Sequence, residues 1–226
     1  MNLKIFYEDN HIIVCYKPRG ILSQADNTKD LDMLTIIKNY IKEKYNKPGN
    51  VYLGLVHRLD RNTDGIMVFA KTSKAASRLS SDIKNDLFHK KYLAVVEGRL
   101  EGKAILNDML YYDEVKKKAF IKNVAGSKKA SLEYEALDYK DNKTLLDIKL
   151  YTGRHHQIRC ELAHLGHPII GDLKYGSKLN YGDTYALTAY SLSIIHPTKR
   201  EEMEFKYIPS DDFYNIFNIV KIKKGL

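Results

Sequence analysis

Residues 51–71 read VYLGLVHRLDRNTDGIMVFAK, a charged segment enclosed by two apolar ones. The apolar segments, Val51–Val56 and Gly65–Lys71, have the composition of strands, so we predict two strands joined by the loop His57–Asp64. Catalytic groups often lie on loops that a rigid sheet supports, and the arginines on both sides of Asp60 would keep its carboxylate ionised. Two interpretations remain open at this point: a catalytic loop, or a solvated turn whose aspartate caps the backbone.

The segments upstream and downstream of this stretch alternate between strand and helix patterns. Leu3–Tyr16 predicts two short strands with a turn at Asp9-Asn10, and Leu31–Tyr45 predicts a helix. The apolar stripe of that helix is Met33, Ile37, Tyr40, Ile41 and Tyr45. Ser73 predicts the N-cap of a second helix. The apolar face expected for it is Ala76, Leu79, Ile83 and Leu87.

From Lys91 onward the pattern is mostly that of strands. The predicted strands are Tyr92–Glu97, Ala104–Tyr111, Lys117–Asn123, Ser131–Asp138, Thr144–Tyr151, Tyr185–Ile195 and Glu201–Tyr207. Two more helices are predicted at Arg154–Leu165, with Gly166 as a left-handed cap, and at Asp211–Val220 before the basic tail 221–226. Because strands outnumber helices without regular alternation, we predict an α+β fold with a largely antiparallel mixed β-sheet and flanking helices. No flexible linker divides the chain, so we expect one catalytic domain over residues 1–226, with room for two lobes.

The composition favours a polyanionic partner in a reducing compartment. The chain has 226 residues, 37 Lys and Arg, 28 Asp and Glu, and a formal net charge of +9. Such a surplus suits nucleic acid or an anionic membrane surface. No apolar run approaches the roughly 20 residues that cross a bilayer, and the first residues lack a signal peptide's apolar core. Two cysteines, Cys15 and Cys160, offer no disulfide framework, so we expect a cytoplasmic protein.

Five segments form a recognisable series along the chain. They are FYED at 6–9 leading to IIV at 12–14 and KPRG at 17–20, HRLDRNTDG at 57–65, KYLAVVEG at 91–98, GRHHQIR at 153–159, and HPIIGD at 167–172 with YG at 175–176. In content and order this series resembles the RluA family of pseudouridine synthases, which act on RNA. The similarity extends from about Leu3 to Tyr207, and five elements in one order make chance an implausible explanation.

The resemblance implies a role for individual residues. It assigns the catalytic carboxylate to Asp60, the active-site tyrosine to Tyr92, and the arginine that pairs with the carboxylate to Arg159. It implies that Arg58 helps to open the RNA stack and that Ile158 packs near the target base. The other residues of the same motifs that we expect to bind substrate are His57, Arg154 and Gln157.

The implied reaction suits these residue types. Pseudouridine forms when the N1–C1′ bond breaks, the uracil turns, and C5 bonds to C1′. Cleavage builds positive charge on the sugar, as in glycoside hydrolysis, and one carboxylate can attack C1′ or accept a proton from C2′. The sequence leaves both routes open. No redox step occurs, so we expect no metal and no organic cofactor.

The expected partner is a ribosomal or transfer RNA stem-loop, bound by a monomer with no obligate protein partner and no membrane. Candidate phosphate contacts are lysine clusters, each of which could instead be a solvated face. These clusters are Lys116–Lys118, Lys128-Lys129, His89–Lys91, and Lys221, Lys223 and Lys224. Many relatives carry a small RNA-binding domain before the opening hairpin, and we expect this form to lack it.

Several positions depart from the usual family pattern, which puts substrate choice in doubt more than the reaction. Asp64 replaces a common Ser and is expected to point outward. His155 replaces Thr or Ser, Cys160-Glu161 replaces Val-His, and Thr188 stands where His is frequent.

Three alternatives to catalysis by Asp60 stay open. His156, Cys160 and His164 recur every four residues, a spacing that could bind zinc on a helix. The chain could be a non-catalytic RNA-binding module of the same fold, although the presence of all three implied catalytic residues argues against this. It could also be a base-removing glycosylase, which would release free uracil.

Overall fold

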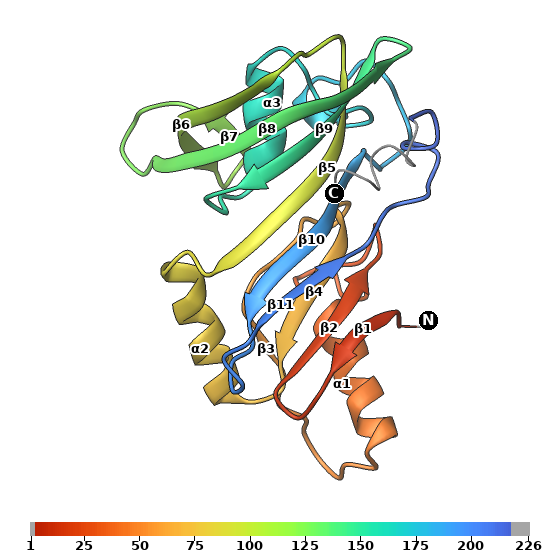
Figure 1. Cartoon of the computed structure of the whole chain (residues 1–226), viewed down its shortest axis with the longest axis vertical. Coiled ribbons are helices and arrows are strands. Elements are labelled where there is room, and N and C mark those ends of the chain that lie inside the picture. The colour runs from red at the N-terminus through yellow and green to blue at the C-terminus, as the bar shows by residue number, and fades with distance from the viewer. Residues whose placement is uncertain (1–2, 218–226) are drawn as a thin grey trace. The chain divides into compact units, whose positions relative to one another are not determined.

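The computed structural model describes residues 3–217 of the chain. They form two compact units: unit 1, residues 3–89 and 191–207, and unit 2, residues 90–190 and 208–217 (Figure 1). The chain passes between the units three times: within β5 (Phe88–Glu97), within β10 (Leu187–Ile195) and after Tyr207. Antiparallel strand pairs with accompanying helices form both units, which confirms the predicted α+β fold. A single catalytic domain over the whole chain stays a prediction.

The strands of unit 1 hold the two ends of the 57–64 loop. They are β1 (Ile5–Glu8), β2 (Ile12–Lys17), β3 (Gly54–Leu55), β4 (Asp64–Ala70) and β11 (Glu202–Lys206), with the second half of β10. The order β1-β2-β4 is antiparallel, and β3 also pairs with β4. Lys17 at the end of β2 lies opposite Gly65 at the start of β4. This register places Lys17 where the loop ends.

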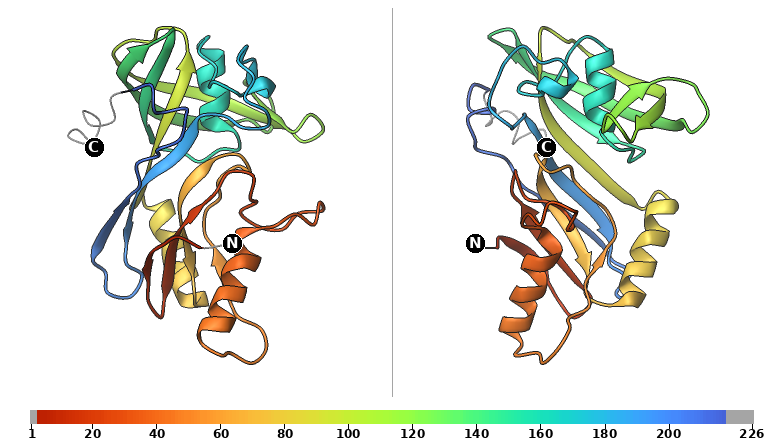
Figure 2. Two further views of the ribbon diagram at one scale, coloured as in Figure 1. Left: turned by 90° about the vertical axis from the view of Figure 1, so that its right-hand side faces the viewer. Right: turned by 180° about the vertical axis from the view of Figure 1, so that it is seen from behind.

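Two helices accompany these strands (Figure 2). In α1 (Met33–Lys44) the Asp32 carboxylate caps the first turn by accepting from the Thr35 amide at 3.1 Å. In α2 (Ser73–Lys84) the cap is Thr72, one residue before the predicted Ser73, and its Oγ1 accepts from the Ala75 amide at 3.1 Å. Either cap satisfies an amide that has no partner within its helix.

The buried faces of the two helices differ from the prediction at their C-terminal ends. Tyr45 follows the end of α1 and is 44% exposed, because its hydroxyl donates to Glu8 instead of entering the core. Ile83 and Leu87 are also exposed. The inward face of α2 carries Asp82, whose carboxylate pairs with Arg200 at 3.3 Å.

Unit 2 contains the remaining antiparallel strands of the sheet and one α-helix, which packs on β6 (Lys103–Asp113) and β7 (Lys118–Ile121). Its further elements are β8 (Lys128–Lys140), β9 (Lys143–Leu150), α3 (Gln157–His164) and the 3-10 turn η1 (Leu173–Tyr175). The strand order is β5-β9-β8-β6-β7. A small buried cluster joins α3 to β6 and β7. Its members are Leu110, Ala119, Ala130, Cys160 and Tyr175.

Two predicted boundaries are corrected. The strand predicted at Val51–Val56 is only Gly54–Leu55, and α3 begins at Gln157 rather than Arg154 because His156 has a left-handed backbone (φ 55°). Gly166 takes the predicted left-handed conformation after α3.

The described part of the predicted helix Asp211–Val220 consists of turns. The Tyr214 and Phe217 amides each donate to the carbonyl three residues earlier, and only the Asn215 amide donates to one four residues earlier, so no α-helix is formed over the described part. The remainder of that segment and the basic tail 221–226 lie outside the described residues. None of the helices within residues 3–217 is long and apolar enough to span a membrane.

Candidate active site

The loop between β3 and β4 is fixed from beneath by His57 and Leu59, which are both buried. The His57 ring lies 5.1 Å from that of Phe88, and its Nε2 accepts from the Val68 amide at 3.1 Å. Leu59 is held at both of its backbone groups by Ser23, whose Oγ accepts from the Leu59 amide at 3.1 Å and donates to the Leu59 carbonyl at 2.7 Å. The residue before Asp60 therefore has a fixed backbone. The predicted contact of His57 with substrate stays a prediction.

Asp60 and Arg58 are accessible in this loop, as are Arg61 and Asn62 further along it. Asp60 is half-buried and Arg58 is exposed. The Asp60 carbonyl accepts from the Thr63 amide at 3.1 Å, which closes the turn after the carboxylate. The loop thus presents a carboxylate and a guanidinium on a rigid backbone.

Lys17 braces the other end of the loop. It is fully buried, and its Nζ donates to the carbonyls of Pro18, Arg61 and Thr63 at 3.0, 2.9 and 2.7 Å. Burial lowers the pKa of Lys17 to about 7, although the nearby carboxylates of Asp64 and Asp60 act in the opposite direction. One ammonium group therefore ties the end of β2 to two carbonyls of the loop.

Asp64 points inward, so the expectation that it points outward is wrong. Its side chain is 1% exposed, accepts from the Tyr16 hydroxyl at 2.6 Å, and pairs with Arg19 at 3.0 Å. Burial and the Asp64 charge both raise the pKa of Tyr16, so this hydroxyl stays a donor. The charged partner Arg19 makes the burial of this aspartate tolerable.

Tyr92, Ile158 and Arg159 lie in unit 2 and are all buried. Tyr92 is on β5 opposite Ile148 of β9. Arg159, in the first turn of α3, donates from Nε and Nη2 to the two Asp172 carboxylate oxygens at 2.6 and 2.9 Å. This bidentate pair fixes the plane of the guanidinium.

Arg154 and Gln157 shape the segment before α3. Gln157 is buried, and its Oε1 accepts from the Thr152 hydroxyl at 2.8 Å and from the Arg154 amide at 3.0 Å. Arg154 is exposed, and its Nε donates to the Lys129 carbonyl at 2.8 Å. Gln157 thereby orders the backbone that presents Arg154. Their predicted substrate contacts stay predictions.

Comparisons with known proteins decide the family. Residues 11–164 match the model of the RNA pseudouridylate synthase family. The chain belongs to this family. A ribosomal large subunit pseudouridine synthase D of Yersinia pestis is 31% identical over 97% of this chain and 71% of its own length. An uncharacterised RNA pseudouridine synthase of Bacillus subtilis is 35% identical over 90% of this chain and 71% of its own.

Solved structures agree on the fold. The human RNA pseudouridylate synthase domain containing 4 has a TM-score of 0.76 at 21% identity, over 93% of this chain and 90% of that one. The resemblance to the RluA branch of the family is confirmed by the ribosomal large subunit synthases among the relatives.

The zinc interpretation of α3 does not fit this member of the family. Cys160 is buried in the apolar cluster, and burial raises the pKa of its thiol to about 12, whereas zinc binds the thiolate. His156 instead meets the Tyr175 hydroxyl through Nδ1 at 3.0 Å, and His164 is exposed. Among residues 3–217 these three side chains are not gathered as a ligand group.

The sequence missed two residues that position the family motifs. Lys17 was quoted only within the segment KPRG, and its carbonyl acceptors Arg61 and Thr63 lie more than forty positions later in the chain. Asp172 received no role because its partner Arg159 lies thirteen positions earlier, beyond local pattern. Of the departures from the family pattern, His155 is exposed, whereas Asp64, Glu161 and Thr188 are buried.

Proposed function

We propose that this family member isomerises specific uridines of structured RNA to pseudouridine, with Asp60 as the catalytic carboxylate. The observation that carries the assignment is the fixation of the loop: Leu59 is held at both backbone groups, and Lys17 binds two carbonyls beyond Asp60. A carboxylate on a pre-organised backbone loses little entropy when it engages the sugar.

Two routes are compatible with one carboxylate. In the first, an Asp60 oxygen attacks C1′ while the N1–C1′ electron pair leaves with the uracil. In the second, Asp60 accepts the C2′ proton and a glycal forms as the base departs. In the first route, C5 of the turned base bonds to C1′ as the Asp60 ester oxygen leaves that carbon. In the second, C5 bonds to C1′ of the glycal and the proton returns from Asp60 to C2′. In both routes C5 then loses its proton and N1 gains one. No atom is gained or lost by the RNA.

Tyr92 and Arg159 are proposed as the other catalytic residues. Arg159 supports an ionised carboxylate, and its fixed plane suits a charge-assisted hydrogen bond. Tyr92 stacks on the uracil or assists removal of the C5 proton. Arg58 is proposed to open the stack and Ile158 to pack on the target base. His57, Arg154 and Gln157 are proposed as further substrate-binding residues.

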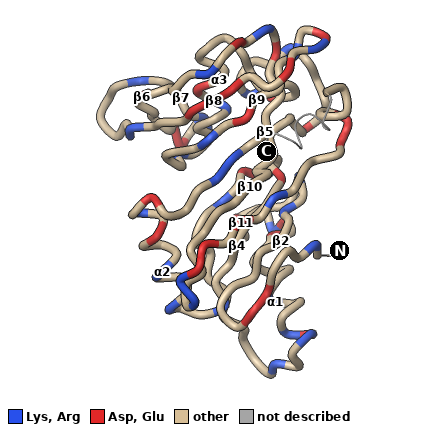
Figure 3. The backbone as a smooth tube through the Cα atoms, in the orientation of Figure 1, with Lys and Arg blue, Asp and Glu red and all other residues tan. Residues whose placement is uncertain are grey.

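The RNA class is proposed to be ribosomal rather than transfer RNA, because several relatives are named for the large ribosomal subunit. Extracting a base from its stack costs roughly a few kcal/mol, which phosphate contacts help to offset. The lysines Lys116, Lys117, Lys128 and Lys129 of unit 2 are exposed and suited to such contacts. Figure 3 marks the Lys and Arg positions along the backbone. We further propose that the protein acts as a cytoplasmic monomer, which its mass in solution and cell fractionation would test.

The test is pseudouridine mapping by carbodiimide treatment and primer extension. Total RNA is taken from cells that lack the gene and from cells complemented with wild type, Asp60→Ala, or Asp26→Ala, an exposed aspartate before α1 that serves as control. One or a few sites should vanish on deletion and return with wild type and Asp26→Ala only.

Other outcomes distinguish the alternatives. Unchanged sites together with RNA binding by the pure protein would favour a non-catalytic binding module. Release of free uracil would favour a glycosylase. Restoration of the sites by Asp60→Ala would remove Asp60 from the mechanism.

A further inference from the structure

An exposed pair of stacked aromatic rings stands just before α3 in unit 2. The rings of His155 and Tyr112 are nearly parallel, with centroids 4.1 Å apart and planes at 17°. His155 is exposed, and Tyr112 of β6 is half-buried beside the cluster that joins β6 and β7 to α3. One face of the imidazole is therefore supported by a ring that the core anchors.

His156 borders this stack without covering it. Its centroid lies 4.5 Å from that of His155 and 5.9 Å from that of Tyr112, and its plane makes angles of 68° and 82° with those rings. Together with the 4.1 Å between Tyr112 and His155, these distances place the three ring centroids close to a right-angled triangle, with the right angle at His155. His156 therefore lies at the edge of the His155 ring, not over its outer face.

The stack is fixed to the core through a short chain of hydrogen bonds. His156 Nδ1 lies 3.0 Å from the Tyr175 hydroxyl, which accepts from the Ala119 amide at 2.7 Å. Tyr175 and Ala119 are buried members of the cluster between α3 and β7. The left-handed backbone at His156 turns the chain at this point. The platform is thus ordered before any ligand arrives.

Positive charge accompanies the platform. Arg154, the residue before His155, is exposed, and the Lys118 ammonium lies 4.9 Å from the centroid of the Tyr175 ring. An ordered aromatic surface with adjacent cations is the combination that binds single-stranded nucleic acid, because each base has a π-face and each nucleotide a phosphate.

We infer that the Tyr112–His155 pair is a stacking platform for one unpaired base of the RNA substrate, with Arg154 and Lys118 serving its phosphates. The inference rests on the proposed function, since it takes the bound polymer to be RNA. The platform gives this chain a means of choosing RNAs in which an unpaired base occupies a set distance from the target uridine.

Binding of abasic RNA tests this. The probe is a fluorescent synthetic RNA stem-loop with uridines and adenosines in its loop, compared by anisotropy with a series in which one loop base at a time is replaced by an abasic ribose. The phosphates stay, so only stacking and base contacts change. For wild type, we expect one abasic position to weaken binding about tenfold, the effect of losing one base–aromatic stack.

The variants assign that loss to the platform. His155→Ala should bind intact RNA about as weakly as wild type binds the critical abasic RNA, and should no longer distinguish the two. His155→Phe keeps a ring and should keep the discrimination. His164→Ala, an exposed histidine at the other end of α3, is the matched control and should resemble wild type. Thermal unfolding checks that all three variants fold.

Two results would overturn the platform: equal binding of every abasic RNA by wild type, or unchanged discrimination by His155→Ala. Pseudouridine formation is measured separately. If wild type discriminates against an abasic loop but forms no pseudouridine, the proposed reaction fails and the platform stands. If pseudouridine forms without discrimination, the platform fails and the reaction stands.

Discussion

Lys17 in unit 1 and Glu161 in unit 2 are both ionisable residues in the protein interior, and their surroundings differ. Lys17 has three carbonyl acceptors within 3.0 Å, two of them in the loop that carries Asp60. Glu161 lies on the buried side of α3, and neither of its carboxyl oxygens has a hydrogen-bond partner among residues 3–217. One buried polar group braces a loop, while the other is merely accommodated.

The pKa values of both groups are shifted in the direction that favours the neutral form. Burial lowers the pKa of Lys17 to about 7 from 10.5. Burial raises the pKa of Glu161 to about 8 from 4.5, with a smaller rise from Asp108 and an opposing effect of the nearby Gln157 amide. The comparison teaches that burial sets the direction of each shift, whereas hydrogen bonding decides whether the group has a structural use.

Replacing Lys17 should produce the largest effect. Lys17→Met leaves three carbonyls without their donor, so we expect a loss of about 3 kcal/mol in the free energy of unfolding, measured by urea titration. Pseudouridine formation should fall much further than the folded fraction, because the loop around Asp60 loses its brace.

Lys71→Met is the matched control. The Lys71 side chain is 8% exposed and binds Glu8 at 2.8 Å, away from the loop. This variant should lose stability but keep its activity per folded molecule. Equal activity losses in the two variants would show that Lys17 acts only through stability.

The pH dependence of Lys17 has a definite sign. The folded protein releases this proton near pH 7 and the unfolded chain near 10.5, so between these values the unfolded chain binds more protons. Wild-type stability should therefore rise relative to Lys17→Met from pH 7 to 10.5. A neutral amine has two N–H groups for three carbonyls, so activity should decline over the start of this range.

Much of the fold around this brace could be predicted from the sequence. The first hairpin, the loop between two strands and the glycine after α3 follow local rules of alternation, turn chemistry and capping. The buried faces of α1 and α2 were less predictable near their ends, because Tyr45 and Asp82 are placed by distant partners, Glu8 and Arg200.

For the candidate site, the sequence indicated which motifs matter but not how each side chain is used. Asp64 looked like a solvated loop residue because its partners Tyr16 and Arg19 precede it by more than forty positions. The Tyr112–His155 stack joins a strand to a loop across a similar separation. Such tertiary pairs leave no periodic signal, so only the folded structure reveals them.

Replacing Glu161 should have a moderate and pH-dependent effect. Its pKa is raised on folding, so the unfolded chain loses the proton first, and wild-type stability should fall as pH rises from 4.5 to 8. Glu161→Gln has no proton to lose and should lack this fall, giving a gain on the order of 2 kcal/mol at pH 8. Urea titrations across this range measure the difference.

Glu135→Gln is the control for this prediction, because Glu135 is exposed on β8. The stability of Glu135→Gln should change with pH in the same way as that of wild type. If the stability of Glu161→Gln fell with pH as steeply as that of wild type, Glu161 would be ionised in the folded protein. The contrast between a hydrogen-bonded Lys17 and an unbonded, neutral Glu161 would then disappear.

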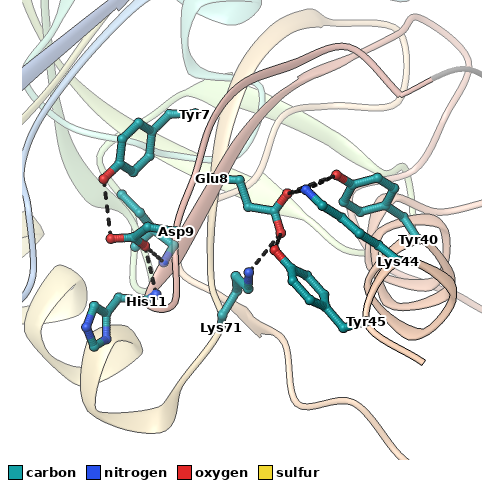
Figure 4. Close-up of polar contacts among 9 residues, drawn as sticks. Tyr7, Glu8, Asp9, His11, Tyr40, Lys44, Tyr45 and Lys71 are labelled. Carbon is teal, nitrogen blue, oxygen red and sulfur yellow. Dashed lines mark hydrogen bonds and ion pairs between the residues drawn. The ribbon is translucent and has the colours of Figure 1, made fainter. Parts of the chain in front are cut away.

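The smallest effect on stability is expected at Glu8. Its carboxylate accepts several hydrogen bonds, whereas the Glu161 oxygens accept none within the described part of the chain. Burial alone would raise its pKa, but hydrogen bonds from Lys44, Lys71, Tyr45 and Tyr40 lower it to about 2 (Figure 4). Their donor atoms lie 2.7–2.9 Å from the carboxylate oxygens. The Lys44 side chain is 45% exposed, so solvent screens part of the attraction.

The pKa of Glu8 is lower in the folded protein than in the unfolded chain. Its contribution to the free energy of unfolding is therefore complete above pH 4.5 and is lost as pH falls toward 2. Glu8→Gln should cost about 1 kcal/mol near neutral pH and converge with wild type in acid, and Tyr45→Phe should cost about half as much. Unfolding of the three proteins by urea from pH 7 to pH 2 measures both. Glu8 and Glu161 should then show opposite slopes of stability against pH, because hydrogen bonds keep the Glu8 carboxylate ionised whereas burial keeps Glu161 protonated. A Glu8→Gln curve that runs parallel to wild type down to pH 2 would show that these hydrogen bonds do not hold the charge.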